Sequence, residues 1–147
     1  MRQGINKLFN NIRIVEIVPI EIMNKRWLCV GFEEKKVNRN DNLHIVLVLN
    51  SSTQSLGDDL IYFLKNGFNE EKDIFTRIHS ECILGDALYS SLCDCGKQLF
   101  YAFKLINKKN CGIIIYLRQE GRGIGLRNKL SCLALQEGYI KGKKNNA

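Results

Sequence analysis

The residues of this chain whose types and spacing could do chemistry are three clustered cysteines, Cys82, Cys93 and Cys95. Zinc in proteins favours thiolate ligands in tetrahedral geometry, so three protein ligands would leave one position for water. That open position is typical of a catalytic site, where the bound water becomes a nucleophile near neutral pH. A fourth ligand from His79 would instead make a closed structural site, and the spacing leaves both alternatives open. In either case we expect one zinc ion per chain.

Hydrogen-bonding side chains crowd the first of these cysteines. They lie just past the end of an expected strand and include Arg77, His79, Ser80, Glu81 and Asp86. A loop that only faces solvent needs no such density of polar groups, which favours a functional site. The remaining cysteines, Cys29, Cys111 and Cys132, stand singly among apolar residues, so we expect them to be small core residues rather than parts of a disulfide scaffold.

A glycine-rich turn at residues 120–125 follows an apolar run and opens an expected helix. Glycines let the backbone approach a ligand closely, and free amides at a helix start attract phosphate. Arg122 adds a fork of donors suited to phosphate oxygens. The spacing Gly121-x-Gly123-x-Gly125 is not the dinucleotide-binding pattern. A tight turn with solvated charges is the other interpretation, and the turn alone does not separate the two.

The elements that must position these groups differ between the two halves of the chain. Four segments rich in β-branched and apolar residues are expected strands, at residues 12–20, 27–32, 44–49 and 74–79. Residues 58–64 fit either a helix or a strand. In the second half, Leu99, Phe100, Phe103 and Ile106 fall at helical spacing, which predicts an amphipathic helix over 96–107.

An unbroken apolar run at 113–117 predicts a strand covered on both faces, and a helix is expected over 124–136. These elements predict an α/β fold, a mixed β-sheet with flanking helices. Its N-terminal half is strand-rich and its C-terminal half follows the order β-α-β-α. In such folds, binding sites lie at the turns from strand to helix.

The length and composition of the chain limit the classes of protein to which it can belong. With 147 residues, 45% of them hydrophobic and 25% charged, the chain fits one globular domain. We expect this domain over residues 1–139 and a disordered tail over 140–147. No apolar run is long enough to span a bilayer, and the N-terminus lacks the apolar core of a signal peptide, so a cytoplasmic location is expected. The formal net charge of +7 favours a polyanionic partner, either a nucleotide or a nucleic acid.

Two long segments resemble the GTP cyclohydrolase II family. Its zinc-binding segment is similar to RIHSEC at 77–82, GDAL at 85–88 and CDCG at 93–96, followed by Gln98. Its nucleotide-binding turn is similar to RQEGRGIGL at 118–126, followed by Asn128 and Lys129. The strong match covers residues 77–136, and the N-terminal third matches loosely. Both segments occur in the family's order and spacing, so we interpret the chain as related to that family.

The resemblance implies a hydrolase that opens the imidazole ring of GTP and releases formate and pyrophosphate, the first step of riboflavin biosynthesis. Zinc on Cys82, Cys93 and Cys95 would activate a water that attacks C8 of the guanine ring. Magnesium would accompany GTP, and a homodimer would be the expected assembly. The residues implied to bind substrate are Arg77, Ile78, His79, Ser80, Glu81, Gln98, Glu120, Gly121 and Arg122.

Departures from the family leave an alternative open. Leu92 stands where the family usually has Arg, and Leu133 where it usually has a catalytic Tyr. The family's acid–base residue and its nucleophile lie beyond the end of this chain, so no catalytic residue is assigned and the domain is expected to be C-terminally truncated. The alternative is therefore a truncated or degenerate member that binds zinc and GTP without turnover. A basic zinc module that binds nucleic acid is less favoured, because a second Cys/His pair is missing.

Overall fold

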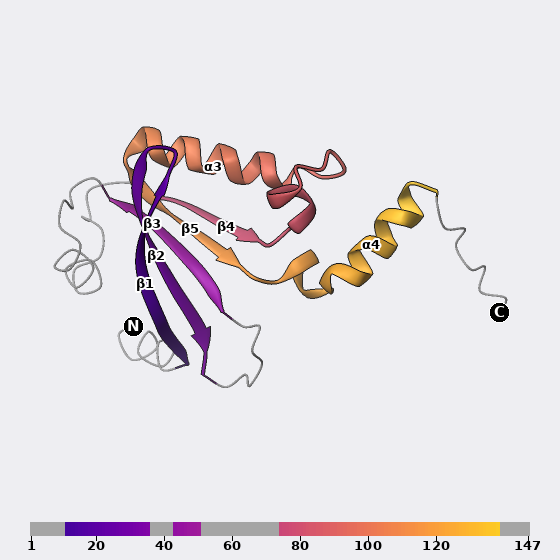
Figure 1. The fold of residues 1–147 in the computed structure, drawn as a ribbon, viewed down its shortest axis with the longest axis horizontal. Helices are drawn as coiled ribbons and strands as arrows, with labels where there is room; N and C mark the ends of the chain where they lie inside the picture. The colour runs from indigo at the N-terminus through magenta and orange to yellow at the C-terminus, as the bar shows by residue number, and fades with distance from the viewer. Residues whose placement is uncertain (1–10, 36–42, 51–73, 139–147) are drawn as a thin grey trace.

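The structure is a computed structural model that describes residues 11–35, 43–50 and 74–138. The ambiguous segment at 58–64 and the expected tail at 140–147 lie outside the described residues. The strands are β1 (Ile12–Ile22), β2 (Lys25–Glu34), β3 (His44–Asn50), β4 (Phe75–Ser80) and β5 (Cys111–Leu117). The longer helices are α3 (Cys95–Lys109) and α4 (Gly125–Gln136) (Figure 1).

The five described strands form one mixed sheet in the order β1-β2-β3-β5-β4. The first three pairs in this order are antiparallel, whereas β4 runs parallel to β5. A two-residue turn joins β1 to β2, and both of its residues, Met23 and Asn24, have positive φ, as a tight hairpin requires. The expected α/β class with a mixed sheet is confirmed, and each expected strand is present with ends shifted by a few residues.

Helix α3 packs along the sheet and forms the core with it (Figure 1). The buried core residues are Trp27, Leu47, Leu49, Ala102, Ile106 and Ile114. The Trp27 ring meets the Phe103 ring edge to face, with centroids 5.3 Å apart. Phe100, expected on the apolar face of α3, is instead 49% exposed, and Lys104 lies over its ring. The core-facing stripe of α3 is therefore narrower than its sequence suggested.

The described residues cover one face of β5, and the cover predicted for its second face stays a prediction. Gly112 and Ile114 are buried, but their neighbours Ile113 and Ile115 remain partly exposed. Within the described part of the chain, α3 contacts both β4 and β5, and the short turn at residues 120–123 contacts β4. The apolar run at 113–117 is thus a central strand with one packed face.

Helix α4 projects away from the sheet (Figure 1). None of its residues is buried, and Cys132 on it is exposed, so the expected core role of Cys132 is wrong. Cys29 and Cys111 are partly buried, as small residues within strands can be. Among the described helices, none has the length and apolar character needed to cross a membrane.

Candidate metal and nucleotide site

The three predicted metal ligands come together at the end of the sheet. Cys82 follows β4 and begins a π-helical turn (Ile83–Ala87), while Cys93 and Cys95 flank the start of α3. The three sulfur atoms lie within 4.8 Å of one another, and the Sγ atoms of Cys82 and Cys93 are 3.5 Å apart. Tetrahedral zinc with Zn–S bonds of about 2.3 Å would separate its sulfur ligands by roughly 3.8 Å. The donor set therefore fits a zinc ion.

Two glycines allow this convergence. A Cβ atom added at Gly96 would lie 2.0 Å from the carbonyl oxygen of Gly85, so the π-helical turn and the start of α3 are in direct backbone contact. A Cβ atom added at Gly85 would lie 3.0 Å from the Sγ atom of Cys93. The turn that carries Cys82 thus reaches the other two cysteines because both glycines lack side chains.

His79 is held away from a ligand role. It is 2% exposed, and its Nε2 atom lies 3.1 Å from both carboxylate oxygens of Asp86. Among the described residues, the group of ligand atoms close enough to share a metal contains the three cysteines and not His79. The arrangement favours three protein ligands with an open position over the closed alternative.

Asp86 connects the metal turn to the sheet. One of its carboxylate oxygens accepts hydrogen bonds from the backbone amide of Cys82, at 3.0 Å, and from the Tyr116 hydroxyl on β5, at 2.8 Å. The ring of Tyr116 also stacks on that of His79, with centroids 5.5 Å apart. Burial, together with the hydrogen bond to Asp86, raises the pKa of Tyr116 well above its ordinary value, so its hydroxyl remains a donor.

Replacing Tyr116 by phenylalanine should loosen this connection. We expect a loss of about 1.5–3 kcal/mol in the free energy of unfolding, the usual worth of a hydrogen bond to a charged group. Urea denaturation of the metal-free protein measures it. Tyr101→Phe is the matched control, because the Tyr101 side chain is 67% exposed. Equal losses in the two variants would contradict a specific role for the bond to Asp86.

The glycine turn reaches the metal site through Glu120 and Lys129. The Lys129 ammonium donates to the Sγ atom of Cys82, at 2.8 Å, and to one carboxylate oxygen of Glu120, at 2.6 Å. The other carboxylate oxygen of Glu120 accepts from the backbone amide of Ile83, at 2.8 Å. Sequence reasoning gave Lys129 no role beyond the resemblance, since nothing local in the sequence connects it to Cys82.

These contacts act on the protonation of the thiols. Burial raises the pKa of Cys82, but hydrogen bonds from Lys129, from the Gly85 amide and from the neighbouring cysteines outweigh it, so the net pKa falls below its ordinary value. Burial, together with the nearby sulfur atoms of Cys82 and Cys93, raises the pKa of Cys95 to about 12. The site therefore favours the thiolate at Cys82 over that at Cys95.

A cavity of about 320 Å³ adjoins the cysteines. It is lined by Arg77, Ile78, His79, Ser80, Glu81, Cys82, Cys95, Gln98, Gly121, Arg122 and Lys129. Every residue implied to bind substrate is among them except Glu120, whose carboxylate is engaged behind Lys129. The structure therefore brings the two resembling segments to one cavity, although they are far apart in the sequence.

The glycine turn has an unusual backbone. A short 3-10 turn (Glu120–Gly123) contains Gly121 and Arg122, both left-handed with φ near 60°: 62° for Gly121 and 59° for Arg122. Left-handed geometry is uncommon outside glycine, and such residues cluster at functional sites. Ile124 at the start of α4 offers no side-chain acceptor to the first amides of the helix. The amides of Arg122 and Ile124 donate within the turn, so the amides that can face an anion are those at the start of α4.

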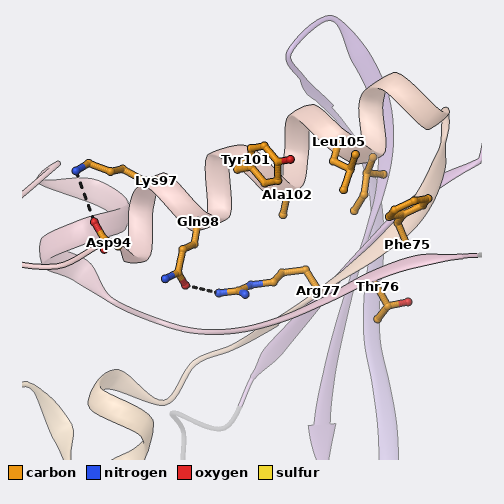
Figure 2. Close-up of a pocket in the computed structure, with 10 residues that line it drawn as sticks. Phe75, Thr76, Arg77, Asp94, Lys97, Gln98, Tyr101, Ala102 and Leu105 are labelled. Atoms are coloured by element: carbon orange, nitrogen blue, oxygen red, sulfur yellow. Dashed lines mark hydrogen bonds and ion pairs between the residues drawn. The ribbon is translucent and has the colours of Figure 1, made fainter.

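A second hollow of about 570 Å³ lies between β4 and α3, and Figure 2 shows its lining. Arg77 donates to the side-chain oxygen of Gln98, at 2.8 Å, across its floor (Figure 2). Both residues also line the cavity beside the cysteines, so this pair forms a wall common to the two hollows. The pairing orients the Arg77 guanidinium.

Comparison with known proteins supports the resemblance. Residues 15–146 match the model of the family described as GTP cyclohydrolase II. GTP cyclohydrolase-2 of Blochmanniella pennsylvanica is 46% identical over 111 residues, which are 76% of this chain and 46% of that protein. The protein of the same name from Neisseria meningitidis serogroup B is 44% identical over 92 residues, 63% of this chain and 47% of that protein. The chain spans about half the length of the curated relatives it matches.

Proposed function

This chain belongs to the GTP cyclohydrolase II family, and from that premise we propose that it binds zinc and GTP at the cavity beside its three cysteines. The proposed reaction is the hydrolytic opening of the GTP imidazole ring with release of formate and pyrophosphate, the first step of riboflavin biosynthesis. The observation that carries the proposal is the group of three sulfur atoms within 4.8 Å of one another at the edge of this cavity. Magnesium bound with the triphosphate, a homodimer and a cytoplasmic location remain predictions.

Cationic side chains in the cavity suit a triphosphate. Arg77 and Arg122 line it, and guanidinium groups bind phosphate oxygens through paired hydrogen bonds. The start of α4, where no side chain caps the first amides of the helix, adds backbone amides of the kind that bind anions. We propose that these groups hold the phosphates while the base lies toward the cysteines.

The metal would supply the nucleophile, because zinc with an open coordination position lowers the pKa of its bound water to near 7. The side chains of the chain have other tasks. Gln98 already accepts a hydrogen bond from the Arg77 guanidinium, and it would keep that group oriented toward the nucleotide. The buried pair of His79 and Asp86 would keep the Cys82 amide and thiol in place.

A second candidate is binding of zinc and GTP without turnover. One observation favours it: Leu133 is partly buried on α4, at the position where the resemblance implies a catalytic tyrosine. An aliphatic side chain can neither donate nor accept a proton. The two candidates share the metal and the nucleotide and differ only in the chemical step.

The test measures metal, nucleotide and product in one preparation. We expect about one zinc per chain by elemental analysis, and GTP binding by titration calorimetry that is lost after zinc is removed with a chelator and restored by adding zinc back. Formate release from GTP at neutral pH identifies turnover, whereas GTP binding without formate identifies the second candidate. A gently purified protein that contains no zinc and cannot be loaded with it would reject both.

A further inference from the structure

We propose that Lys129 is a positioning residue of the metal site, in which its ammonium group is the charge partner of the Cys82 sulfur and Glu120 holds it there. The inference rests on the proposed zinc site. It gives Glu120 a role in the metal centre, which differs from the substrate contact that the resemblance implies for this residue. It also makes the glycine turn and α4 parts of that centre.

The contacts of Lys129 are short and shielded. Its Nζ atom lies 2.8 Å from the Cys82 Sγ atom and 2.6 Å from a Glu120 carboxylate oxygen. The Lys129 side chain is 16% exposed and that of Glu120 is 13% exposed. Charges so placed are screened by water much less than those of a surface ion pair. Water therefore weakens the attraction between the ammonium group and the sulfur less than it weakens an exposed ion pair.

Helix packing does not account for this placement. No residue of α4 is fully buried in the described part of the chain, so a buried apolar contact of the helix is not what directs Lys129 toward the cysteines. Lysine loses about 1.5–2 kcal/mol of side-chain freedom when it is fixed. The bonds to Cys82 and Glu120 must offset this cost, which indicates that they are what anchors this part of α4.

Glu120 fixes Lys129 by using both carboxylate oxygens. One binds the ammonium group, and the other accepts the backbone amide of Ile83, the residue after Cys82. The left-handed Gly121 makes this possible, because a Cβ atom there would lie 2.7 Å from the Ile124 side chain and 3.6 Å from the Cβ atom of Lys129. The carboxylate thus joins the glycine turn, the helix and the metal turn at one point.

Charge balance explains what the lysine contributes. Three thiolates around a divalent zinc ion carry a formal net charge of 3 × (−1) + 2 = −1, and a partly buried net charge is costly unless it is paired. With the Glu120 carboxylate included, the formal sum is 3 × (−1) + 2 − 1 = −2 without the lysine and −1 with it. The ammonium group thus removes one unit of uncompensated negative charge and donates an N–H···S hydrogen bond to a ligand sulfur. Partners that orient metal ligands in this way typically change metal affinity by about 10- to 100-fold when they are removed.

The experiment measures zinc affinity by competition with a chelator at neutral pH. The proteins compared are the wild type, Lys129→Met, Lys129→Arg, Glu120→Gln and the control Lys108→Met, which removes an exposed lysine on α3. We expect Lys129→Met to bind zinc about 10- to 100-fold more weakly than the wild type. Lys129→Arg and Glu120→Gln should lose less, because the first keeps the charge and the second keeps the lysine. Lys108→Met should match the wild type.

A spectroscopic signature separates a direct effect on the sulfur from general loosening. In cobalt-substituted protein, the sulfur-to-cobalt charge-transfer band should move to longer wavelength in Lys129→Met, because the sulfur lone pair loses its hydrogen bond. Wild-type affinity together with an unshifted band in Lys129→Met would overturn the inference and leave the proposed zinc site standing. If that variant does not fold, wild-type affinity in Glu120→Gln overturns it instead. A wild type that binds no zinc would reject the proposed function itself.

Discussion

Replacing Cys93 by serine is expected to abolish zinc binding. The Cys93 sulfur lies 3.5 Å from that of Cys82, and the two approach from different elements, so Cys93 closes the site from the α3 side. A serine hydroxyl stays protonated at neutral pH and is a poor ligand for zinc, which prefers thiolates. The loss should exceed the roughly 10- to 100-fold typical of residues that only support a ligand. Elemental analysis of the purified variant measures it.

Cys132→Ser is the matched control for this variant, because it makes the same chemical change at an exposed thiol on α4. It should retain the zinc content of the wild type. If Cys93→Ser also kept its zinc, Cys93 would not be a ligand. If both variants lost zinc equally, the loss would reflect a general effect of removing thiols rather than the geometry of the site.

The parts of the fold that could be predicted from the sequence are those that depend on local sequence patterns. Alternation and β-branched residues located β1 to β4, and helical spacing located α3, because each pattern depends on residues only a few positions apart. The site features were also local patterns in the sequence: the spacing of Cys93 and Cys95, the polar residues around Cys82, and the glycine turn. They sufficed to name the family and the three ligands as candidates.

What could not be predicted depends on contacts between distant segments. The bond from Lys129 to Cys82 spans 47 residues, and no periodicity signals it. Cys132 has apolar neighbours in sequence, which predicted burial, but no described residue of α4 is buried and the thiol is exposed. An apolar run indicates which surface can be buried, but whether that surface is buried depends on the segments that pack against it.

The roles of the candidate substrate residues also remain predictions, but the structure narrows them. Arg77 from β4 and Arg122 from the glycine turn line one cavity, so two elements contribute a guanidinium group to it. Glu120 differs, because Lys129 and the Ile83 amide already occupy its carboxylate oxygens. A nucleotide contact from Glu120 would therefore compete with bonds that support the metal site.

Replacing Gly96 by alanine should have the second largest effect, on both stability and zinc affinity. The added Cβ atom would lie 2.0 Å from the Gly85 carbonyl oxygen and 2.8 Å from the Gly85 carbonyl carbon. Both are backbone atoms, so no side chain can rotate to relieve the overlap. Overpacking usually costs about 1–3 kcal/mol, and we expect this rigid contact to lie at or above the upper end. Urea denaturation of the metal-free protein measures the change in the free energy of unfolding.

The same overlap should weaken the metal site, because it can be relieved only by moving the turn that carries Cys82 away from the start of α3 that carries Cys95. Gly31→Ala is the control, since a Cβ atom there would first meet the flexible end of the Leu43 side chain, at 3.3 Å. Gly31→Ala should keep the zinc affinity of the wild type, whereas Gly96→Ala should lose it in a chelator competition. If Gly96→Ala instead kept the zinc affinity of the wild type, the backbone contact between Gly85 and Gly96 would not be what sets the distances between the sulfur ligands.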